Sequence, residues 1–459
     1  MVDFINIRKG LEVPVAGAPD RRIIDVAKID TVAVKPTDFK HLAPKLMVKE
    51  GDKVLAGSVL FVDKARPRIQ FTSPVSGTVD QIVRGDKRKL LAVVVKADEK
   101  TQYKEFEPVK VESASAEQII SALLESGLWP CIKQRPYGII PAPEVAPKAI
   151  FVSGFHSAPL SSDLDFSLRE ELDSVQAAVR AFLKILPGGV HFGIKASNHA
   201  STPFHKLSGV KFHTFEGPHP AGNVGVQISK VCPIAKGDVV WTVDLHLMAV
   251  IGRFLLKGIV DMSKIVAVGG PMAKTPGYVK GVCGMSMKNI GTLVAEKPEL
   301  SLQKGQKVRF VSGSPLTGTN VGEDGYLGFY DDSVSLLSEG NYNEWFGWAK
   351  IFRPKKFSFS RGYFSWLTPR KKYAMDTNTN GGVRAFVLSG YYDKVFPMDI
   401  YPVYLLKACL AGDIEKMEQL GIYEVVEEDF ALCDYICPSK IECQKIISDG
   451  IDLMLKEME

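Results

Sequence analysis

Three cysteines stand close together near the end of the chain, in a pattern that invites a redox or metal interpretation. Cys433, Cys437 and Cys443 fall within one short stretch, and a proline follows the second of them. A tetranuclear iron–sulfur cluster needs four thiolates at the spacing C-x2-C-x2-C-x3-C-P, and only its last step is present. A zinc knuckle would need a Cys-x2-Cys pair, which is also missing. We therefore expect no metal here.

A second candidate is the loop at 216–225, where glycines and prolines crowd between two apolar stretches. Glycines let backbone N–H groups approach a phosphate, so the loop could cradle a dinucleotide. Its spacing is not G-x-G-x-x-G, and Pro218 and Pro220 lack the N–H donors that a cradle uses. A structural loop is favoured, and the phosphate cradle stays as the alternative.

The stretch 350–372 contains eight basic residues and no acid, interleaved with aromatic residues. Basic and aromatic side chains suit the headgroup level of a membrane or a membrane-embedded partner. The same types bind nucleic acid, but the net charge of +5 is low for a dedicated nucleic-acid binder. A surface hairpin with inward-packed aromatics is the remaining alternative. We expect partner or membrane contact and no nucleic acid, with these candidate residues: Lys355, Lys356, Trp366, Lys371 and Lys372.

Composition places these residues in a large globular chain. The chain is 24% charged and 46% hydrophobic, which is typical of folded domains. Its 459 residues are too many for one core of ordinary size. No window approaches 18 uncharged apolar residues, and the start lacks the pattern of a signal peptide, so we expect a cytoplasmic chain without a membrane span. Seven cysteines without an export signal predict free thiols.

Short strands and turn signals at 46–95 predict a small β-sandwich similar to lipoyl and biotinyl carrier domains. Carriers bear their prosthetic group on a hairpin-tip lysine, and Lys64 lies near that place. Because the insert 66–68 lengthens the hairpin, a surface lysine is favoured over a swinging arm.

Strand patterns at 149–152, 190–194 and 239–243 alternate with helical periods at 113–127, 168–186 and 245–257, which predicts a mainly parallel α/β sheet. The next stretch is glycine-rich and β-like, and residues from Pro402 are helical. The expected domains are a β-sandwich at 1–100, a Rossmann-like α/β domain at 101–258, a β-grasp-like domain at 259–335 and a C-terminal domain with an acidic helical bundle at 336–459.

Several longer motifs extend a resemblance over almost the whole chain. They include Phe71-Thr72-Ser73-Pro74-Val75-Ser76-Gly77, Glu125-Ser126-Gly127-Leu128-Trp129, Gly217-Pro218-His219-Pro220-Ala221-Gly222 and Glu427-Glu428-Asp429-x-Ala431-Leu432-Cys433. The sequence resembles the A subunits of the Na+-translocating NADH:quinone oxidoreductases. That family is related to the C subunit of Rnf-type complexes and to the flavin-binding subunit of complex I. The resemblance implies an α+β and α/β multidomain fold: a barrel-sandwich hybrid, a Rossmann-like domain, a β-grasp soluble-ligand-binding domain and a helical end.

The relatives bind flavin and NADH on a glycine-rich loop that matches 127–136 here. Leu128 and Trp129 replace small residues, and Pro130 removes an N–H donor. The resemblance therefore implies a subunit of the reductase, a translocase, with no catalytic, metal or cofactor-binding residues of its own. We expect no flavin, no iron–sulfur cluster and no covalent cofactor, and an isolated chain that is inactive.

The family's proposed quinone regions match 34–41 and 131–138. The candidate quinone residues are Val34, His41, Trp129, Cys131, Arg135, Pro136 and Tyr137. Alternatively, Trp129 and Pro136 fill the volume of an ancestral flavin. The quinone, ubiquinone or menaquinone, stays open.

The resemblance also implies partners and a location. The expected partners are the other subunits of the sodium pump, above all an integral membrane subunit, and the expected place is the cytoplasmic side of the bacterial inner membrane. Sodium movement would belong to the membrane partners, because this chain has no span of its own. A purely structural docking subunit without a ligand site is the alternative.

Overall fold

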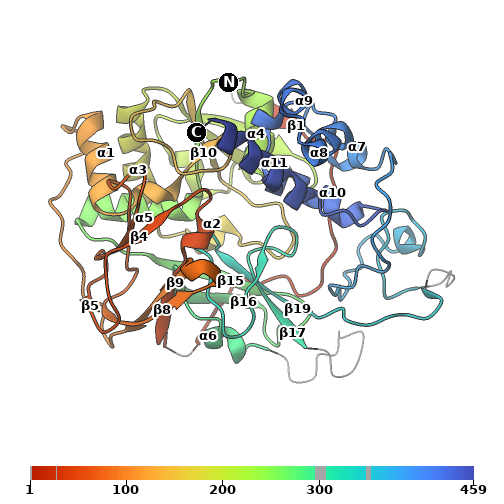
Figure 1. The fold of residues 1–459 in the computed structure, drawn as a ribbon, viewed down its shortest axis with the longest axis horizontal. Helices are drawn as coiled ribbons and strands as arrows, with labels where there is room; N and C mark the ends of the chain where they lie inside the picture. The colour runs from red at the N-terminus through yellow and green to blue at the C-terminus, as the bar shows by residue number, and fades with distance from the viewer. Residues whose placement is uncertain (1–2, 27, 295–306, 348–352, 459) are drawn as a thin grey trace.

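The computed structural model describes residues 3–26, 28–294, 307–347 and 353–458 and arranges them around four β-sheets (Figure 1). Two small sheets form the N-terminal barrel-sandwich, and two six-stranded sheets form the α/β unit and the unit that follows it. The C-terminal helices cover one side of the α/β unit, and both chain ends lie near each other at the top of the view (Figure 1).

The barrel-sandwich is built from strands β3 to β9. Sheet order β3-β9-β8-β5 faces sheet order β4-β6-β7, and every pairing within them is antiparallel. The bounds are β3 Thr31–Val34, β4 Pro44–Leu46, β5 Lys53–Val54, β6 Val59–Asp63, β7 Gln70–Thr72, β8 Gly77–Arg84 and β9 Leu90–Ala97, with 3-10 turns η1 Pro36–Asp38 and η2 Asp86–Arg88. The barrel-sandwich that the sequence predicts is thus present, and Lys64 is an exposed residue directly after β6.

The α/β sheet has the order β1-β13-β12-β11-β14-β10, parallel except for β10 at its edge. Its strands are β1 Asp3–Asn6, β10 Ile132–Arg135, β11 Ala149–Ser153, β12 Val190–Lys195, β13 Lys211–Glu216 and β14 Val240–Val243. Its helices are α1 Ala116–Glu125, α2 Leu164–Ser167, α3 Leu172–Ile185, α4 Val224–Val231 and α5 Leu245–Lys257, with 3-10 turns η3 Trp129–Cys131, η4 Ala196–Asn198 and η5 Pro203–Lys206.

Alternation along the central strand β11 sends side chains to both faces of this sheet. Ile150 and Val152 join the large core that also contains the barrel-sandwich and helices α3 and α5. Ala149 and Phe151 join a second core that contains α4 and the C-terminal helices. Both faces are therefore covered, which is what a parallel sheet requires.

Local sequence explains how the helices of this unit start, end and pack. Ser115 and Gln118 form a reciprocal capping box at the start of α1. Helix α5 ends at Gly258, whose φ of 67° is the left-handed C-cap conformation. A Cβ on Gly252 would lie 1.6 Å from the Ser174 carbonyl oxygen, so glycine is what lets α3 and α5 approach so closely.

The third unit contains a mixed sheet of order β18-β17-β19-β15-β16-β2. Its elements are β2 Ile23–Ile24, β15 Ser263–Gly269, β16 Gly277–Val282, α6 Lys288–Gly291, β17 Val308–Ser312, β18 Thr319–Asn320 and β19 Ser333–Ser338.

The first two strands of the chain pair outside the barrel-sandwich. Strand β1 pairs with β13 of the α/β sheet, and β2 pairs with β16 of the third unit. The chain thus adds a short parallel strand to the edge of each six-stranded sheet before it enters the barrel-sandwich at β3.

The C-terminal unit is helical, as the sequence predicts. Its elements are η7 Ser365–Leu367, α7 Tyr392–Val395, α8 Pro402–Ala411, α9 Ile414–Gln419, η8 Ile422–Glu424, η9 Glu427–Phe430, α10 Ala431–Ile436 and α11 Cys443–Met458. Among the described residues, no helix is long and apolar enough to cross a bilayer.

Candidate functional site

The topology of the α/β sheet creates a crevice between β11 and β14. Strands β12 and β13 follow β11 in sequence and lie on one side of it, whereas β14, the next strand, lies on its other side. Ligands of open α/β sheets bind outside the carboxyl ends of the strands at such a switch point. A cavity of about 370 Å³ lies there, and Ser153 at the end of β11 and Asp244 after β14 both line it.

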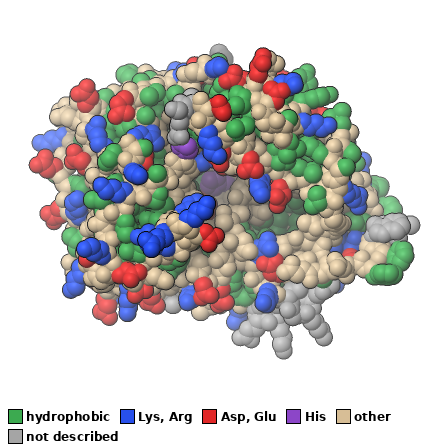
Figure 2. Space-filling model, in the orientation of Figure 1, with side chains coloured by type: hydrophobic (Ala, Val, Ile, Leu, Met, Phe, Trp, Pro, Cys, Tyr) green, Lys and Arg blue, Asp and Glu red, His purple; other side chains and the backbone are tan. Residues whose placement is uncertain are grey.

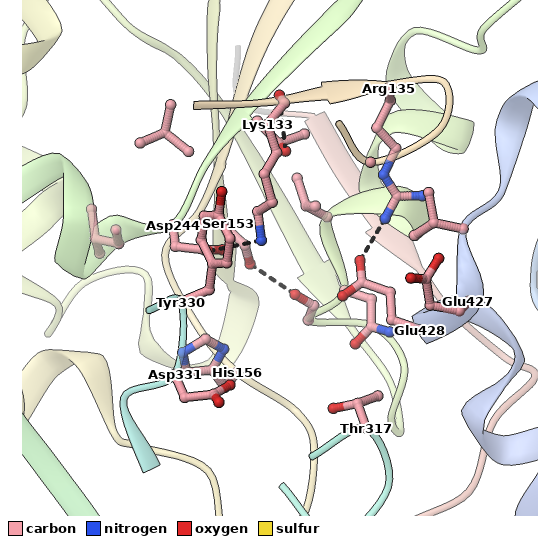
Figure 3. Close-up of a pocket in the computed structure, with 18 of the residues that line it drawn as sticks. Lys133, Arg135, Ser153, His156, Asp244, Thr317, Tyr330, Asp331, Glu427 and Glu428 are labelled. Atoms are coloured by element: carbon pink, nitrogen blue, oxygen red, sulfur yellow. Dashed lines mark hydrogen bonds and ion pairs between the residues drawn. The ribbon is translucent and has the colours of Figure 1, made fainter. Parts of the chain in front are cut away.

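Two walls of this cavity come from other units. Thr317, Tyr330 and Asp331 belong to the third unit, and Glu427, Glu428 and Gln444 belong to the C-terminal unit. Figure 3 shows these side chains converging with Lys133, Arg135 and His156 of the α/β unit. In the space-filling view a hollow lies near the middle of the face, with basic and acidic side chains around its rim (Figure 2).

Lys133 of strand β10 forms an ion pair with Asp244, which follows the neighbouring strand β14. Its Nζ lies 2.9 Å from Asp244 Oδ2 and 4.4 Å from the ring centroid of Tyr330. Burial alone would lower the pKa of Lys133, but the Asp244 and Glu428 carboxylates outweigh it and raise that pKa. Burial alone would raise the pKa of Asp244, and Lys133 and His246 lower it instead. The pair therefore stays charged at neutral pH.

Arg135 joins the α/β sheet to the C-terminal unit. Its Nη1 donates to Asp429 Oδ2 at 2.7 Å and its Nη2 to Glu428 Oε1 at 2.5 Å. The side chains of Arg135 and Asp429 are 4% and 0% exposed, so this ion pair is fully desolvated. A Cβ on Gly225 would lie 2.6 Å from both Arg135 Nη1 and Asp429 Oδ1, so the glycine leaves room for the pair.

A third charged pair lies toward the third unit. His156 Nε2 lies 3.2 Å from Asp332 Oδ2. Burial alone would lower the pKa of His156, but Asp332 raises it, and His156 in turn holds the pKa of Asp332 well below its usual range against the effect of burial. Burial lowers the pKa of the nearby His246 to about 4, and neither ring nitrogen of His246 has a hydrogen-bond partner among the described residues.

The segment 34–41 of the barrel-sandwich contacts residues that line the cavity. Lys40 Nζ lies 3.0 Å from Oε2 of Glu427, which lines the cavity. The ring of Phe39 packs against Tyr330, with centroids 5.7 Å apart. Tyr330 in turn donates from Oη to the Pro130 carbonyl at 2.7 Å. Of the two stretches that the resemblance marks for quinone, 131–138 therefore lines the cavity and 34–41 contacts its wall.

Of the seven candidate quinone residues, the structure places Arg135 in the cavity wall. Trp129 and Cys131 are fully buried in the core, where Trp129 packs edge-to-face on Trp241 and donates from Nε1 to the Pro141 carbonyl. Val34 is buried in β3 and His41 is an exposed residue with φ of 58°. The remaining two, Pro136 and Tyr137, are buried, and Tyr137 packs against Tyr423 in the second core.

The core position of Trp129 also bears on the loop 127–136. Residues 127–131 connect α1 to the antiparallel edge strand β10, and most of the remaining stretch is β10 itself. The glycine and proline loop 216–225 is the one at the carboxyl edge, where Gly222 and Asn223 line the cavity. The Gly222 N–H already donates to Ser157 Oγ at 2.8 Å, so it is not open to a phosphate.

The sequence analysis missed most of the cavity: Lys133, His156, Asp244, Thr317, Tyr330 and Glu428. A usable signal existed for two of them. Lys133 and Arg135 are two residues apart in one short strand and so share a face, and Asp244 follows a buried strand and begins a helix.

The candidate contact residues for a partner or membrane lie on a separate surface. Lys355, Trp366, Lys371 and Lys372 are exposed, whereas Lys356 is half-buried and donates to Asn380 Oδ1 at 2.5 Å. We call the exposed members the basic–aromatic surface and include Trp345, Phe364, Leu367 and Arg370, which are exposed in the same segment. Green side chains gather at the right-hand end of Figure 2, where the C-terminal part of the chain lies. Residues 348–352 of the basic stretch fall outside the described residues.

The three cysteines near the chain end are buried free thiols. Within the ranges that the structure describes, no group of three or more His, Cys, Asp or Glu residues is arranged to hold a metal ion.

Together these features define a multidomain α+β protein with a ligand-sized cavity at the switch point of its α/β sheet. Three family models match it in order: the NqrA N-terminal barrel-sandwich hybrid domain at 5–98, the NqrA second alpha/beta domain at 114–260 and the NQRA C-terminal domain at 265–323. Full-length relatives also match, and each is named as the A subunit of a Na(+)-translocating NADH-quinone reductase. They share 35% identity in Vibrio vulnificus, 37% in Serratia proteamaculans and 33% in Neisseria meningitidis, each over 99% of this chain and 100% of the relative.

The chain belongs to the NqrA family, the A subunits of the Na+-translocating NADH-quinone reductases, as the sequence motifs predict. Among solved structures, an NAD+-reducing [NiFe]-hydrogenase in the air-oxidized state aligns with a TM-score of 0.39 and 11% identity, over 76% of this chain and 62% of that chain. A likeness at that level supports no conclusion about function.

Proposed function

We propose that this chain is a peripheral subunit of the NADH-quinone reductase that holds the quinone head group in the switch-point cavity. The observation that carries the proposal is that Lys133 and Arg135 of the stretch 131–138 line the cavity, while Lys40 of the stretch 34–41 pairs with Glu427 of its wall. Two stretches about a hundred residues apart in sequence thus contribute to the cavity, one directly and one through a wall residue.

The cavity has the size and wall chemistry that a quinone ring needs. Its volume of about 370 Å³ is within the range of small-molecule sites. Val224, Val243 and Val426 offer apolar contact for the ring faces. Lys133 and Thr317 stand on different walls and can each donate a hydrogen bond to a quinone carbonyl (Figure 3).

Binding of short-chain quinones tests this proposal. We expect the full chain to bind a ubiquinone or a menaquinone analogue with saturable one-to-one stoichiometry in titration calorimetry. Val224→Trp should abolish binding because the indole fills the cavity. Lys133→Met should weaken it about tenfold by removing one charged donor. Trp129→Phe is the matched control, since this side chain is buried outside the cavity.

Equal affinity in the wild type and in Val224→Trp would contradict a site in this cavity. If neither the chain nor the assembled complex showed saturable binding that depends on these residues, the quinone site would not belong to this chain.

In this proposal the chain carries no flavin or iron–sulfur cluster, so NADH oxidation and sodium movement belong to other subunits. The support comes from the stretch 127–136: Leu128, Trp129 and Pro130 are buried, and Leu128 and Trp129 pack into the large core, where their side chains leave no small-residue loop for a phosphate. An optical spectrum of the purified chain tests this, because a flavin band would contradict it.

We also propose that the chain docks onto an integral membrane subunit, on the cytoplasmic side of the membrane. The observation that favours this second role is the basic–aromatic surface, where Trp345 and Trp366 are 84% and 53% exposed beside exposed lysines. Large exposed aromatics of this kind mark interaction sites.

Charge reversal tests the docking role. Lys371→Glu with Lys372→Glu should release the chain from membranes that contain the other subunits, because both side chains are exposed in that segment. The matched control is Lys87→Glu with Lys89→Glu, which reverses two exposed lysines on the hairpin of the barrel-sandwich. Equal retention of both double variants would contradict docking through this surface.

A further inference from the structure

Three of the seven cysteines meet a tyrosine inside the C-terminal helices. Cys433 lies within α10, Cys437 caps the end of α10, and Cys443 is the first residue of α11. Tyr392 begins α7 and packs against them. All four side chains are at most 1% exposed, and every cysteine of the chain is a free thiol. The cavity proposal and the docking proposal use none of these groups.

The sulfur of Cys437 accepts several hydrogen bonds at once. Tyr392 Oη donates to it at 2.9 Å and the Ile441 N–H at 3.3 Å. Cys443 contacts the same two residues, because its Sγ also lies 3.6 Å from the Ile441 carbonyl oxygen. Cys443 Sγ lies 3.5 Å from Tyr392 Oη as well, so its proton can pass along either route. A buried sulfur that faces this many donors is suited to the thiolate form.

The charge state follows from those contacts. The hydrogen bond from Cys443 is the largest influence and, with the bonds from Tyr392, Ile441 and Ser439, lowers the pKa of Cys437 to about 5 against the opposing effect of burial. Burial raises the pKa of Cys131 and Cys433, and raises that of Cys409 to about 11. The chain thus places one anionic sulfur beside one protonated thiol.

We propose that Cys437 and Cys443 form a redox-active dithiol, in which Cys437 is the nucleophile toward a small peroxide and Cys443 is the resolving thiol. A thiolate with an adjacent thiol is the arrangement from which sulfenic acid and then a disulfide form. A metal site is not proposed, because the described residues hold no group of three ligands in a suitable arrangement.

The chemistry balances with hydrogen peroxide as the two-electron oxidant. The Cys437 thiolate attacks one peroxide oxygen, the O–O bond breaks, and sulfenic acid and hydroxide result. Hydroxide takes the Cys443 proton, directly or through Tyr392, and becomes water. The Cys443 thiolate then attacks the sulfenic sulfur, the S–O bond breaks, and the disulfide and a second hydroxide form. The two sulfurs together lose two electrons and peroxide gains them.

Cys443 neighbours a cavity residue in sequence, because Gln444 follows it directly and lines the cavity wall. Both sulfurs are buried, so an oxidant as small as peroxide suits the pair better than a large one. The disulfide would tie the end of α10 to the start of α11 and would remove the acceptor of the Tyr392 hydroxyl.

Ultraviolet absorbance of the thiolate tests the ionisation first. The full wild-type chain should show one thiolate that titrates near pH 5, and Cys437→Ser should lack it. Cys433→Ser is the matched control, because it removes a buried thiol whose pKa is raised and should leave the transition in place. A transition that survives in Cys437→Ser would overturn the assignment.

Mass spectrometry of peroxide-treated chain tests the pairing. After trapping of free thiols in denaturant, the wild type and Cys433→Ser should each lose two thiols, in a cross-link between Cys437 and Cys443. Cys443→Ser should instead show a sulfenic acid at Cys437 that dimedone captures. The proposal is overturned if Cys437→Ser, folded by circular dichroism, still loses two thiols on peroxide treatment, or if the half-buried Cys232 and Cys409 oxidise first.

Discussion

The charged residues around the cavity and those of the basic–aromatic surface differ in burial and in their partners. Arg135 is buried and Lys133 is half-buried, and both have acidic partners within the chain. Lys355 and Lys372 are exposed, and exposed aromatic residues stand beside them. Because a buried charge is costly without a partner and an exposed one is not, Arg135 ties the α/β unit to the C-terminal unit, whereas the exposed lysines are available to another molecule.

The largest effect should come from breaking the buried side of this comparison. Arg135→Met removes the partner of Asp429, whose side chain is fully buried, and should lower the free energy of unfolding by about 3–5 kcal/mol. Urea unfolding measures it. Adding Asp429→Leu should recover most of the loss, because the uncompensated charge disappears with it.

The matched control is an exposed ion pair of the same chemistry. Arg21 lies 2.5 Å from Asp163 with side chains 63% and 33% exposed, so Arg21→Met should change stability by less than about 1 kcal/mol. If Arg135→Met costs no more than Arg21→Met, the buried pair does not join the units as described.

A smaller effect should follow from acid. Burial lowers the pKa of His246 to about 4, below its value of 6.5 in the unfolded chain. Below pH 6.5 the unfolded chain protonates this histidine, whereas the folded chain does so only near pH 4. The free energy of unfolding is therefore at its full value above pH 6.5 and decreases as the pH falls from 6.5 toward 4. The loss at pH 5 should be about 2 kcal/mol, and His246→Leu should flatten that part of the stability curve.

Val250→Ala provides the control for that measurement. Val250 is a fully buried residue of the same helix without a titrating group, so its truncation should lower stability equally at every pH. A His246→Leu curve that runs parallel to the wild type would show that this histidine does not sense acid.

The smallest stability change should come from the basic–aromatic surface. Trp366→Ser with Leu367→Ser removes two side chains that are 53% and 62% exposed, and the free energy of unfolding should stay within about 0.5 kcal/mol. Retention on membranes that carry the other subunits should nevertheless fall. Leu256→Ser, also exposed but at the end of α5, should change neither quantity. Unchanged retention of the double variant would contradict docking through the basic–aromatic surface.

Much of the fold could be predicted because the signals are local. Periodicity predicts the strands at 149–152 and 190–194 and, with a serine cap, the helix within 113–127. The structure confirms them as β11, β12 and α1, and α1 begins after the Ser115 cap. The barrel-sandwich followed from turn spacing. Each of these features needs only neighbouring residues for its interpretation.

The cavity could not be predicted in the same way, because its contacts join residues that are far apart in sequence. Arg135 and Asp429 are separated by 294 positions, and Lys40 and Glu427 by 387. The pairing of β1 with β13 has the same cause. One sequence carries no signal for such partners beyond the presence of buried charges in short strands.

The second hydrophobic core has a consequence for how the chain is made. It contains Phe151 and Phe215 of the α/β sheet together with Ile447 and Ile451 of α11. During synthesis the sheet strands and α4 leave the ribosome long before that last helix, so part of one face of the sheet lacks its cover until translation ends. Chains truncated before α11 should expose this face, aggregate and recruit chaperones, whereas the barrel-sandwich, whose strands are close in sequence, can fold early.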